Sequence, residues 1–291
     1  MRQVIAVMNQ KGGCGKTTTA VNLAGALAVM QQRVLVIDLD PQAHATLALN
    51  GGMAASTPQT RRTIHDALMR RGDLSPILLE VEPGLDLAPS GDDLFFAERE
   101  LGHDEAGETR LADCLRVTQR AWDYVIVDCP PSLGPLTFNG LRACDEILIP
   151  VEIGFFSLNG VGNLLRSLRR YRRSWLEEKR IRAVATLYDR QTTFAREVME
   201  EVRAFFGDAL YRTVIHRTVK LKEAASFGIP ITRYDPRCRG CEDHMALAGE
   251  IVTTAQNAQS AQTQGAAASG WLRFEEDQGD QPGHALESGS R

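Results

Sequence analysis

The fold of this 291-residue chain is decided near its N-terminus, by the stretch KGGCGKTTT at residues 11–19. The apolar run VIAVMN (4–9) comes directly before it, and residues 16–32 carry apolar side chains at helical spacing. The sequence therefore predicts a buried strand, a glycine turn and a helix, in that order. This is the context in which a loop that ends in Gly-Lys-Ser/Thr binds phosphate.

The end of the loop fits that pattern, and its beginning departs from it. Gly15, Lys16 and Thr17 occupy the closing Gly-Lys-Thr positions, whereas Gln10 stands where the pattern has its first glycine. The alternative without a ligand is a glycine turn before an ordinary helix. The position of Gly-Lys-Thr at the junction of strand and helix argues against that alternative.

The chemistry of such a loop assigns a role to each kind of residue. Glycine has no β-carbon, so the backbone at Gly12, Gly13 and Gly15 can come close to phosphate oxygens. The start of the following helix adds unpaired N–H groups and a partial positive charge. We expect Lys16 to reach the β- and γ-phosphates of a nucleoside triphosphate, and the Thr17 hydroxyl to hold Mg²⁺.

Three aspartates follow apolar runs that read as buried strands. Asp38 and Asp40 lie in VIDLDPQAHAT, and Asp128 lies in VIVDCPPS. Carboxylates at the ends of parallel strands meet at the edge where ligands bind in doubly wound sheets. We expect them on the magnesium side of the phosphates, directly or through water, with Asp40 orienting the attacking water. Each aspartate alone could also cap a helix ahead of a turn.

The rest of the chain alternates between strand-like and helix-like blocks. This predicts one α/β domain of the P-loop NTPase type, with a mostly parallel twisted sheet and helices on both faces. The expected strands after the first are 33–40, 146–151, 181–189 and 211–215, with a strand and turn over 84–90 and a strand followed by a loop over 123–132. The expected helices are 16–32, 42–50, 63–79, 92–101, 109–120, 157–177, 194–206, 219–227 and 243–256, with a loop at 51–62. The domain is placed at 1–257, and the acidic, Gly-rich segment 258–291 is expected to be a disordered tail.

Charge and cysteine content exclude some classes of protein. There are 33 Lys and Arg residues against 37 Asp and Glu, a formal net charge of −4, so nucleic-acid binding must depend on local clusters. The six cysteines are scattered, which indicates a reduced cytosolic protein and not a disulfide framework. No stretch is long and apolar enough to span a membrane, and we expect a cytoplasmic protein.

Four segments together resemble the successive signatures of the ParA/Soj partitioning ATPases, within the ParA–MinD group. They are KGGCGKTTTAVNLA (11–24), VLVIDLDPQAHAT (34–46), YVIVDCPPSLG (124–134) and YDPRCRGCEDHMALAGEIV (234–252). The resemblance runs from about residue 2 to residue 255, with the segments in the family's order. The continuation DPQAHAT and the YDP segment point to ParA within the wider group.

The resemblance gives Lys11 a role. It matches the signature lysine of the family's deviant Walker A loop, which crosses to the nucleotide of the partner subunit, so that ATP is held between two protomers. Cys14 matches a variable position that small residues occupy, and we expect it to be buried. The implied nucleotide-binding residues are Lys11, Gly12, Gly13, Cys14, Gly15, Lys16, Thr17 and Thr18. The implied catalytic residues are Lys11, Lys16 and Asp40, and the implied metal-binding residues are Thr17, Asp40 and Asp128, partly through water.

The implied function is that of an ATPase that uses ATP and Mg²⁺ to form a homodimer. The dimer binds double-stranded DNA without sequence preference, and hydrolysis releases it. With a ParB-like partner such a protein segregates chromosome or plasmid DNA, and it associates with the nucleoid when ATP is bound. The candidate DNA contacts are Arg190, Arg217, Lys220 and Lys222. Lys220 falls where the family often has an arginine, whereas Gln191 replaces another; residues 166–173 form a further basic cluster.

Three other functions stay open at this stage. A ParA-like protein can position a cargo other than DNA. A MinD-like, membrane-associated regulator needs a C-terminal amphipathic helix, usually basic, and here the C-terminal segment is acidic; we expect no membrane contact. An iron–sulfur carrier could use Cys238 and Cys241, but a single Cys-x-x-Cys would have to be doubled by a dimer to supply four ligands. The bland reading of these cysteines is two incidental substitutions by small residues.

Overall fold

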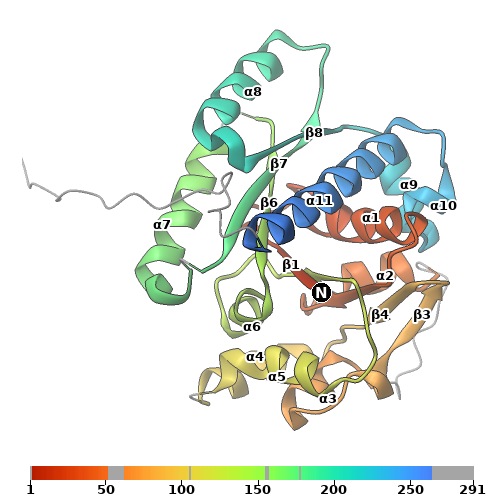
Figure 1. Cartoon of the computed structure of the whole chain (residues 1–291), viewed down its shortest axis with the longest axis vertical. Coiled ribbons are helices and arrows are strands. Elements are labelled where there is room, and N and C mark those ends of the chain that lie inside the picture. The colour runs from red at the N-terminus through yellow and green to blue at the C-terminus, as the bar shows by residue number, and fades with distance from the viewer. Residues whose placement is uncertain (1, 52–61, 105, 155–156, 177, 264–291) are drawn as a thin grey trace, which may run out of the picture.

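The fold was analysed in a computed structural model, which describes residues 2–51, 62–104, 106–154, 157–176 and 178–263. Within these residues, eight strands form one sheet in the order β3-β4-β2-β5-β1-β6-β7-β8 (Figure 1). The strands are β1 (Gln3–Val7), β2 (Val34–Asp38), β3 (Leu79–Glu82), β4 (Leu85–Ala88), β5 (Tyr124–Asp128), β6 (Glu146–Glu152), β7 (Arg180–Tyr188) and β8 (Leu210–His216). Every neighbouring pair is parallel except β3 and β4. The prediction of a mostly parallel α/β fold is confirmed.

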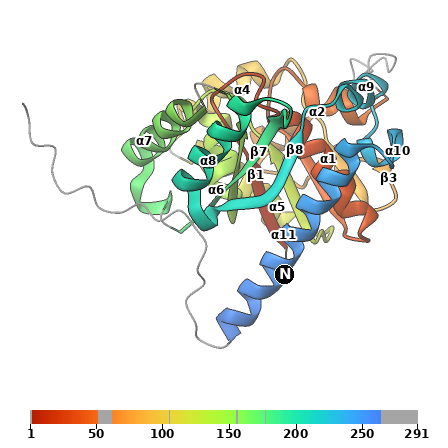
Figure 2. The ribbon, with the colours of Figure 1, turned by 90° about the horizontal axis from the view of Figure 1, so that it is seen from above.

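Helices cover both faces of the sheet (Figures 1 and 2). One core packs α3 to α8 against the sheet, and the other packs α1, α2, α9, α10 and α11. The helices are α1 (Lys16–Val29), α2 (His44–Leu49), α3 (Ile64–Arg70), α4 (Leu94–Gly102), α5 (Arg110–Val117), α6 (Pro135–Ala143), α7 (Ser157–Leu176), α8 (Thr193–Phe206), α9 (Val219–Phe227), α10 (Ile231–Tyr234) and α11 (Arg239–Thr263). Short 3₁₀ turns occur at η2 (Ser75–Ile77), η3 (Gly107–Thr109) and η4 (Gly207–Ala209).

The strand register places the candidate site at one edge of the sheet. Asp128, the last residue of β5, pairs with Val7 at the end of β1 and with Asp38 at the end of β2. β2 to β5 lie on one side of β1 and β6 to β8 lie on the other, so the order of the strands reverses direction at β1. Such a switch point opens a crevice at the carboxyl ends of the strands, where ligands bind in open α/β sheets.

Some predicted elements were wrong in extent or absent. The helix expected over 63–79 stops at Arg70, because Arg71 turns into the left-handed region with φ 50°. Pro76 then lacks the N–H that a continuing helix would need, and β3 follows it. The sequence analysis assigned no element to β3, α6 or α10.

The C-terminal boundary also differs from the expected helix end. α11 runs to Thr263, beyond the helix expected over 243–256 and beyond the domain limit at 257. Residues 264–291, most of the predicted tail, lie outside the described residues, as do 52–61 of the predicted loop. The division of the chain at residue 257 stays a prediction.

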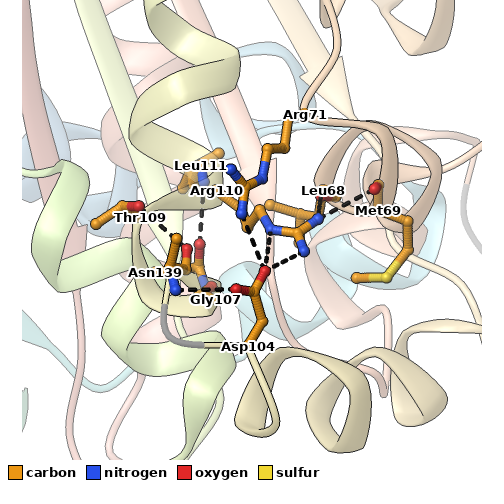
Figure 3. Close-up of polar contacts among 10 residues, drawn as sticks. Leu68, Met69, Arg71, Asp104, Gly107, Thr109, Arg110, Leu111 and Asn139 are labelled. Atoms are coloured by element: carbon orange, nitrogen blue, oxygen red, sulfur yellow. Dashed lines mark hydrogen bonds and ion pairs between the residues drawn. The ribbon is translucent and has the colours of Figure 1, made fainter.

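An ionic cluster fastens the helices that cover one face of the sheet (Figure 3). Arg110, at the start of α5, donates from Nη1 to the carbonyl oxygens of Leu68 and Met69 at 2.9 and 3.0 Å. Its Nε and Nη2 bind the carboxylate of Asp104, which also accepts a 3.0 Å hydrogen bond from Arg71 Nη2. The end of α3 and the start of α5 are therefore held together by charge as well as by apolar packing.

Asn139 continues this attachment to α6 (Figure 3). Its Oδ1 accepts a hydrogen bond from the Leu111 amide at 3.0 Å, and its Nδ2 donates to the Gly107 carbonyl at 2.7 Å. Gly107 has no room for a side chain, because an added β-carbon would lie 2.0 Å from the Leu101 carbonyl oxygen. α6 follows β5, so these contacts support the segment that carries Asp128.

We predict that Asp104→Asn lowers the free energy of unfolding at pH 7. The hydrogen bond from Arg110 is the main cause that holds the pKa of Asp104 at about 2, well below its usual value. A carboxyl with a lowered pKa stabilises the fold above the unfolded pKa of about 4, and this contribution is lost as the pH falls toward 2. Urea unfolding at pH 7, 5 and 3 measures the free energy of unfolding of both proteins. The difference between Asp104→Asn and wild type should be smaller at pH 3 than at pH 7.

The matched control is Asp113→Asn. Asp113 pairs with Arg116 three residues along α5, and that arginine side chain is 75% exposed. An exposed pair of this kind contributes little, so its removal should leave unfolding almost unchanged at every pH. If the loss of unfolding free energy in Asp104→Asn were the same at pH 7 and pH 3, the ionised Asp104 carboxylate would not be its cause.

Candidate functional site

The loop between β1 and α1 has the backbone of an anion site. Gly13 and Gly15 have φ of 75° and 92°, in the left-handed region that residues with a β-carbon rarely adopt. Gly15 precedes α1 and offers no side chain to cap it. The N–H groups of the first turn have no acceptor within the helix and are available to a ligand.

The two lysines of the loop lie in different surroundings. Lys16 is 9% exposed, and its Nζ donates to the carbonyl oxygen of Lys11 at 3.2 Å, so its ammonium lies inside the loop. The Lys11 side chain is 38% exposed. Its Nζ lies 2.6 Å from Oε2 of Glu152, the last residue of β6.

Side chains from distant strands hold the loop in place. Thr186 Oγ1, near the end of β7, donates to the Cys14 carbonyl oxygen at 2.8 Å. Asn9 Nδ2 donates to the Pro150 carbonyl oxygen at 2.8 Å, and Asn9 Oδ1 accepts from the Lys11 amide at 3.1 Å. Cys14 itself is fully buried, as expected, and burial raises the pKa of its thiol.

The sequence analysis missed Asn9, Glu152 and Thr186. Asn9 and Glu152 follow the rule that identified the aspartates, a polar residue at the end of an apolar strand. Glu152 was missed because the expected strand ended at residue 151, one residue before the end of β6. Thr186 lies inside β7, where the pattern of the strand gives no signal of its contact.

Asp38 organises the segment after β2. Its carboxylate accepts hydrogen bonds from the Thr46 amide at 2.7 Å, the Thr46 hydroxyl at 2.8 Å and the Asp40 amide at 3.1 Å. Complete burial raises the pKa of Asp38 to about 6, and the bonds from Thr46 act in the opposite direction. Asp38 therefore ties together the two ends of the segment from Asp40 to Thr46.

Hydrogen bonds hold both the backbone and the carboxylate of Asp40. Its carbonyl oxygen accepts from Ser90 Oγ at 2.7 Å, and its Oδ1 accepts from the Gln42 amide at 2.9 Å. The residue is 9% exposed. These contacts give the carboxylate a defined position at the edge of the crevice.

Asp128 is the least compensated group of the site. It is fully buried, and neither carboxylate oxygen has a hydrogen-bond partner within the described part of the chain. Burial raises its pKa well above the usual range, and the charge of Asp38 raises it further; Thr17 and Lys16 act in the opposite direction. An unpaired buried carboxylate is costly, and a cation next to it would relieve that cost.

The donor set fits magnesium bound together with a nucleotide. Among the described residues, no three His, Cys, Asp or Glu side chains are grouped to hold a metal ion by themselves. Mg²⁺ usually keeps several waters and takes only one or two protein ligands in addition to phosphate oxygens. Thr17, Asp128 and Asp40 suit that role, directly or through water, at the end of the phosphate loop.

The candidate DNA-contacting residues gather at the same edge of the sheet. Arg190 follows β7 and Arg217 follows β8, and both are exposed. The amide of Arg217 donates to the Tyr188 carbonyl oxygen at 3.1 Å, which holds the two segments side by side. Lys220 and Lys222 follow on α9, where Lys220 Nζ pairs with Glu223 at 2.9 Å.

The basic cluster over 166–173 does not join this group. It lies on α7, which Figures 1 and 2 show at the opposite end of the molecule from α9. None of the helices in the described residues has the length and apolarity required to cross a bilayer.

Comparison with known proteins agrees with this geometry. A family model described as an AAA domain matches residues 2–181. The chromosome partitioning protein ParA of Caulobacter vibrioides is 40% identical over 262 residues, which cover 89% of this chain and 97% of that protein. The sporulation initiation inhibitor protein Soj of Bacillus subtilis is 40% identical over 254 residues, covering 87% of this chain and 99% of Soj.

Solved structures show the same fold. Cobyrinic acid a,c-diamide synthase from Mycobacterium smegmatis, with a bound ATP analog and magnesium, matches with a TM-score of 0.76 at 30% identity, covering 89% of this chain and 97% of the other. The septum site-determining protein MinD from Pyrococcus horikoshii, complexed with Mg-ADP, matches with a TM-score of 0.66 at 23% identity over 88% of this chain and 98% of the other. The second match shows the fold alone.

The fold, the loop and these matches define the class as a P-loop ATPase of the AAA-domain family. Within that class, the chain belongs to the ParA/Soj family of partitioning ATPases. The resemblance read from the four sequence segments is confirmed.

We predict that Thr186→Val weakens the site without changing the shape of its side chain. The substitution leaves the buried Cys14 carbonyl oxygen without its donor, which should lower the free energy of unfolding by about 1–2 kcal/mol. A loop that is held less firmly should bind ATP about five-fold more weakly, the equivalent of about 1 kcal/mol. Urea unfolding and titration calorimetry measure the two effects.

Thr253→Val is the matched control. The Thr253 hydroxyl donates to the Gly249 carbonyl oxygen at 2.8 Å on an exposed part of α11. Its loss should change the free energy of unfolding by less than about 0.5 kcal/mol and leave ATP affinity unchanged. Wild-type ATP affinity and stability in Thr186→Val would show that the contact with Cys14 does not support the loop.

Proposed function

We propose that this protein is an ATP-dependent partitioning ATPase that works as a switch between monomer and dimer. ATP and Mg²⁺ assemble a sandwich homodimer, the dimer binds double-stranded DNA without sequence preference, and hydrolysis releases it. With a ParB-like partner it would segregate chromosome or plasmid DNA. The observation that carries the proposal is the contrast between Lys16, buried within its own loop, and Lys11, partly exposed and paired with Glu152.

Binding of ATP requires only small changes at the loop. Lys16 would exchange its bond to the Lys11 carbonyl oxygen for charge-assisted bonds to the β- and γ-phosphates. The amides of residues 12–18 and the start of α1 would surround the phosphates. Bound Mg²⁺ would neutralise charge on the phosphate oxygens, with the Thr17 hydroxyl and the unpartnered Asp128 carboxylate on its protein side.

Lys11 is suited to act on a second nucleotide. Its ion pair with Glu152 is partly exposed, and pairs of that kind contribute at most about 1 kcal/mol, so the pair is readily exchanged. In a dimer the side chain would leave Glu152 and reach the phosphates of the partner subunit. Because this contact needs both the partner and its ATP, it would couple nucleotide binding to dimerisation.

Asp40 is the proposed residue for hydrolysis. The hydrogen bond from Ser90 holds its backbone, and the one from the Gln42 amide holds its carboxylate at the edge of the crevice, where it could orient a water molecule for attack on the γ-phosphate. Hydrolysis removes the γ-phosphate that both lysines contact. The dimer would then separate, and its DNA contacts would be lost with it.

The DNA contact is proposed for the basic residues at the ends of β7 and β8 and on α9. Arg190, Arg217 and Lys222 are exposed, and Lys220 is half-buried beside Glu223. One such group per protomer is a modest charge, in keeping with the acidic balance of the whole chain. A dimer doubles the number of phosphate contacts, which strengthens a purely electrostatic interaction.

We predict that Asp40→Ala binds ATP with wild-type affinity but does not turn it over. The dimer should then persist with ATP–Mg²⁺, because the step that ends it is removed. Phosphate release and size-exclusion chromatography with light scattering measure the two properties. Asp208→Ala, at an exposed aspartate of η4, is the control and should hydrolyse ATP normally. Normal turnover in Asp40→Ala would reject the assignment.

We predict that binding to random-sequence duplex DNA appears only with ATP–Mg²⁺ and is lost in Lys11→Ala and in Lys16→Ala. Fluorescence anisotropy without nucleotide, with ADP and with ATP–Mg²⁺ measures it. Lys16→Ala should also lose ATP binding by the monomer, whereas Lys11→Ala should keep it. Absence of DNA binding under every condition would remove the partitioning mechanism and leave an ATPase switch of the same fold.

The salt dependence of that binding tests the proposed surface. Each phosphate contact removed should reduce the slope of log K against log salt by about 1. Lys220→Ala should therefore flatten the slope, and in a dimer the effect counts twice. Arg203→Ala, at an exposed residue of α8 paired with Glu200, is the control and should not change the slope. Equal slopes for Lys220→Ala and wild type would move the DNA contact elsewhere.

A further inference from the structure

The turn between α10 and α11 carries two cysteines that no step of the ATPase mechanism uses. Cys238 and Cys241 lie in the segment CRGC, and both are free thiols. The Cys238 carbonyl oxygen accepts from the Cys241 amide at 3.0 Å and from the Glu242 amide at 3.1 Å. The second bond is the first i to i+4 bond of α11, so Cys238 is the N-cap residue and Cys241 occupies the third position of the helix.

These two positions face each other across the first turn. N-cap and third-position side chains are close enough to exchange reciprocal hydrogen bonds in a capping box. Side chains three residues apart in a regular helix have β-carbons about 5–6 Å apart, and a disulfide needs about 3.5–4.5 Å. The difference can be closed at Cys238, because its backbone lies outside the regular helix.

The two thiols differ in access to solvent. Cys238 is half-buried, whereas Cys241 is only 4% exposed and packs in the core beneath α9. Burial raises the pKa of Cys241, and the neighbouring Cys238 raises it further. An attacking thiol at the surface with a second thiol behind it is the arrangement of a dithiol that exchanges with small disulfides.

The start of α11 is held firmly, so closure of the pair would not displace the helix. An added β-carbon at Gly240 would lie 3.0 Å from Cγ2 of Thr218 and 3.1 Å from Cγ of Leu221, which shows how closely α11 packs against α9. The other four cysteines of the chain, Cys14, Cys114, Cys129 and Cys144, are at most 1% exposed. Cys238 is thus the thiol of this chain that solvent reaches most easily.

We propose that Cys238 and Cys241 form a thiol–disulfide exchange site for a small disulfide such as oxidised glutathione. The Cys238 thiolate attacks one sulfur of the disulfide, forms a mixed disulfide and releases one thiolate. The Cys241 thiolate then attacks Sγ of Cys238, closes the Cys238–Cys241 bond and releases the second thiolate. The protein loses two electrons and two protons, and the disulfide becomes two thiols. Arg237 is exposed beside Cys238 and carries a positive charge that favours an anionic disulfide, whereas Arg239 is paired with Glu242 and Asp243.

The test treats the reduced full-length protein with oxidised glutathione, quenches with acid and alkylates the remaining thiols. Wild type should lose two thiols and carry no glutathione. Trypsin cleaves after Arg239, between the two cysteines, so the expected product is a pair of tryptic peptides joined by a disulfide. The four buried cysteines serve as internal controls and should be alkylated only after denaturation.

Two variants separate the steps. Cys241→Ala should stop at the mixed disulfide and carry one glutathione on Cys238, because the second thiol is missing. Cys238→Ala should form neither a mixed disulfide nor an internal disulfide, because Cys241 is buried. Thermal unfolding and ATP binding of both variants check that they are folded; this chemistry does not depend on DNA binding, so its outcome is independent of the proposed function.

Several results would overturn the proposal. Wild type that keeps six free thiols in excess oxidised glutathione would exclude exchange. Wild type that stops at a mixed disulfide on Cys238 would show that the two sulfurs cannot meet. Zinc or iron that co-purifies with the reduced protein and protects both cysteines from alkylation would make the pair a metal site instead.

Discussion

Two carboxylates buried next to each other are the constraint on which the site depends. The register of β2 and β5 places Asp38 beside Asp128, and both are removed from water. Like charges at close range in a buried site raise each other's pKa and oppose ionisation. Asp38 is compensated by Thr46 and by the Asp40 amide, whereas Asp128 has no such partner among the described residues. This asymmetry leaves the Asp128 carboxylate as a buried acceptor that a cation would stabilise.

The same loop separates two lysines by burial. Lys16 begins α1 and is enclosed, so its charge is committed to the loop and whatever the loop binds. Lys11 precedes the glycines and rests on Glu152 in a partly exposed pair. A charged side chain in a weak surface ion pair can exchange its partner for a group on another molecule at low cost, whereas a buried charge cannot. The difference between the two residues is one of environment, since their side chains are identical.

Environment likewise separates the six cysteines. Four are enclosed in the cores and behave as small apolar residues. Cys238 and Cys241 lie at the start of a long helix, three residues apart, one half-buried and one buried. A Cys-x-x-Cys segment has no chemistry of its own until the fold decides which sulfur reaches solvent.

The sequence by itself determined the local elements and the reactive groups. β1, the glycine loop and α1 are contiguous, and the aspartates close short apolar strands, so each signal lies within a few residues. The contacts that complete the site could not be predicted in this way. Thr186 reaches Cys14 across 172 positions and Asn9 reaches Pro150 across 141, because β1 lies beside β6 and close to β7 only in the folded sheet. The local sequence places the reactive groups at the ends of strands and in the loop. The order of the strands in the sheet determines which of these groups come into contact.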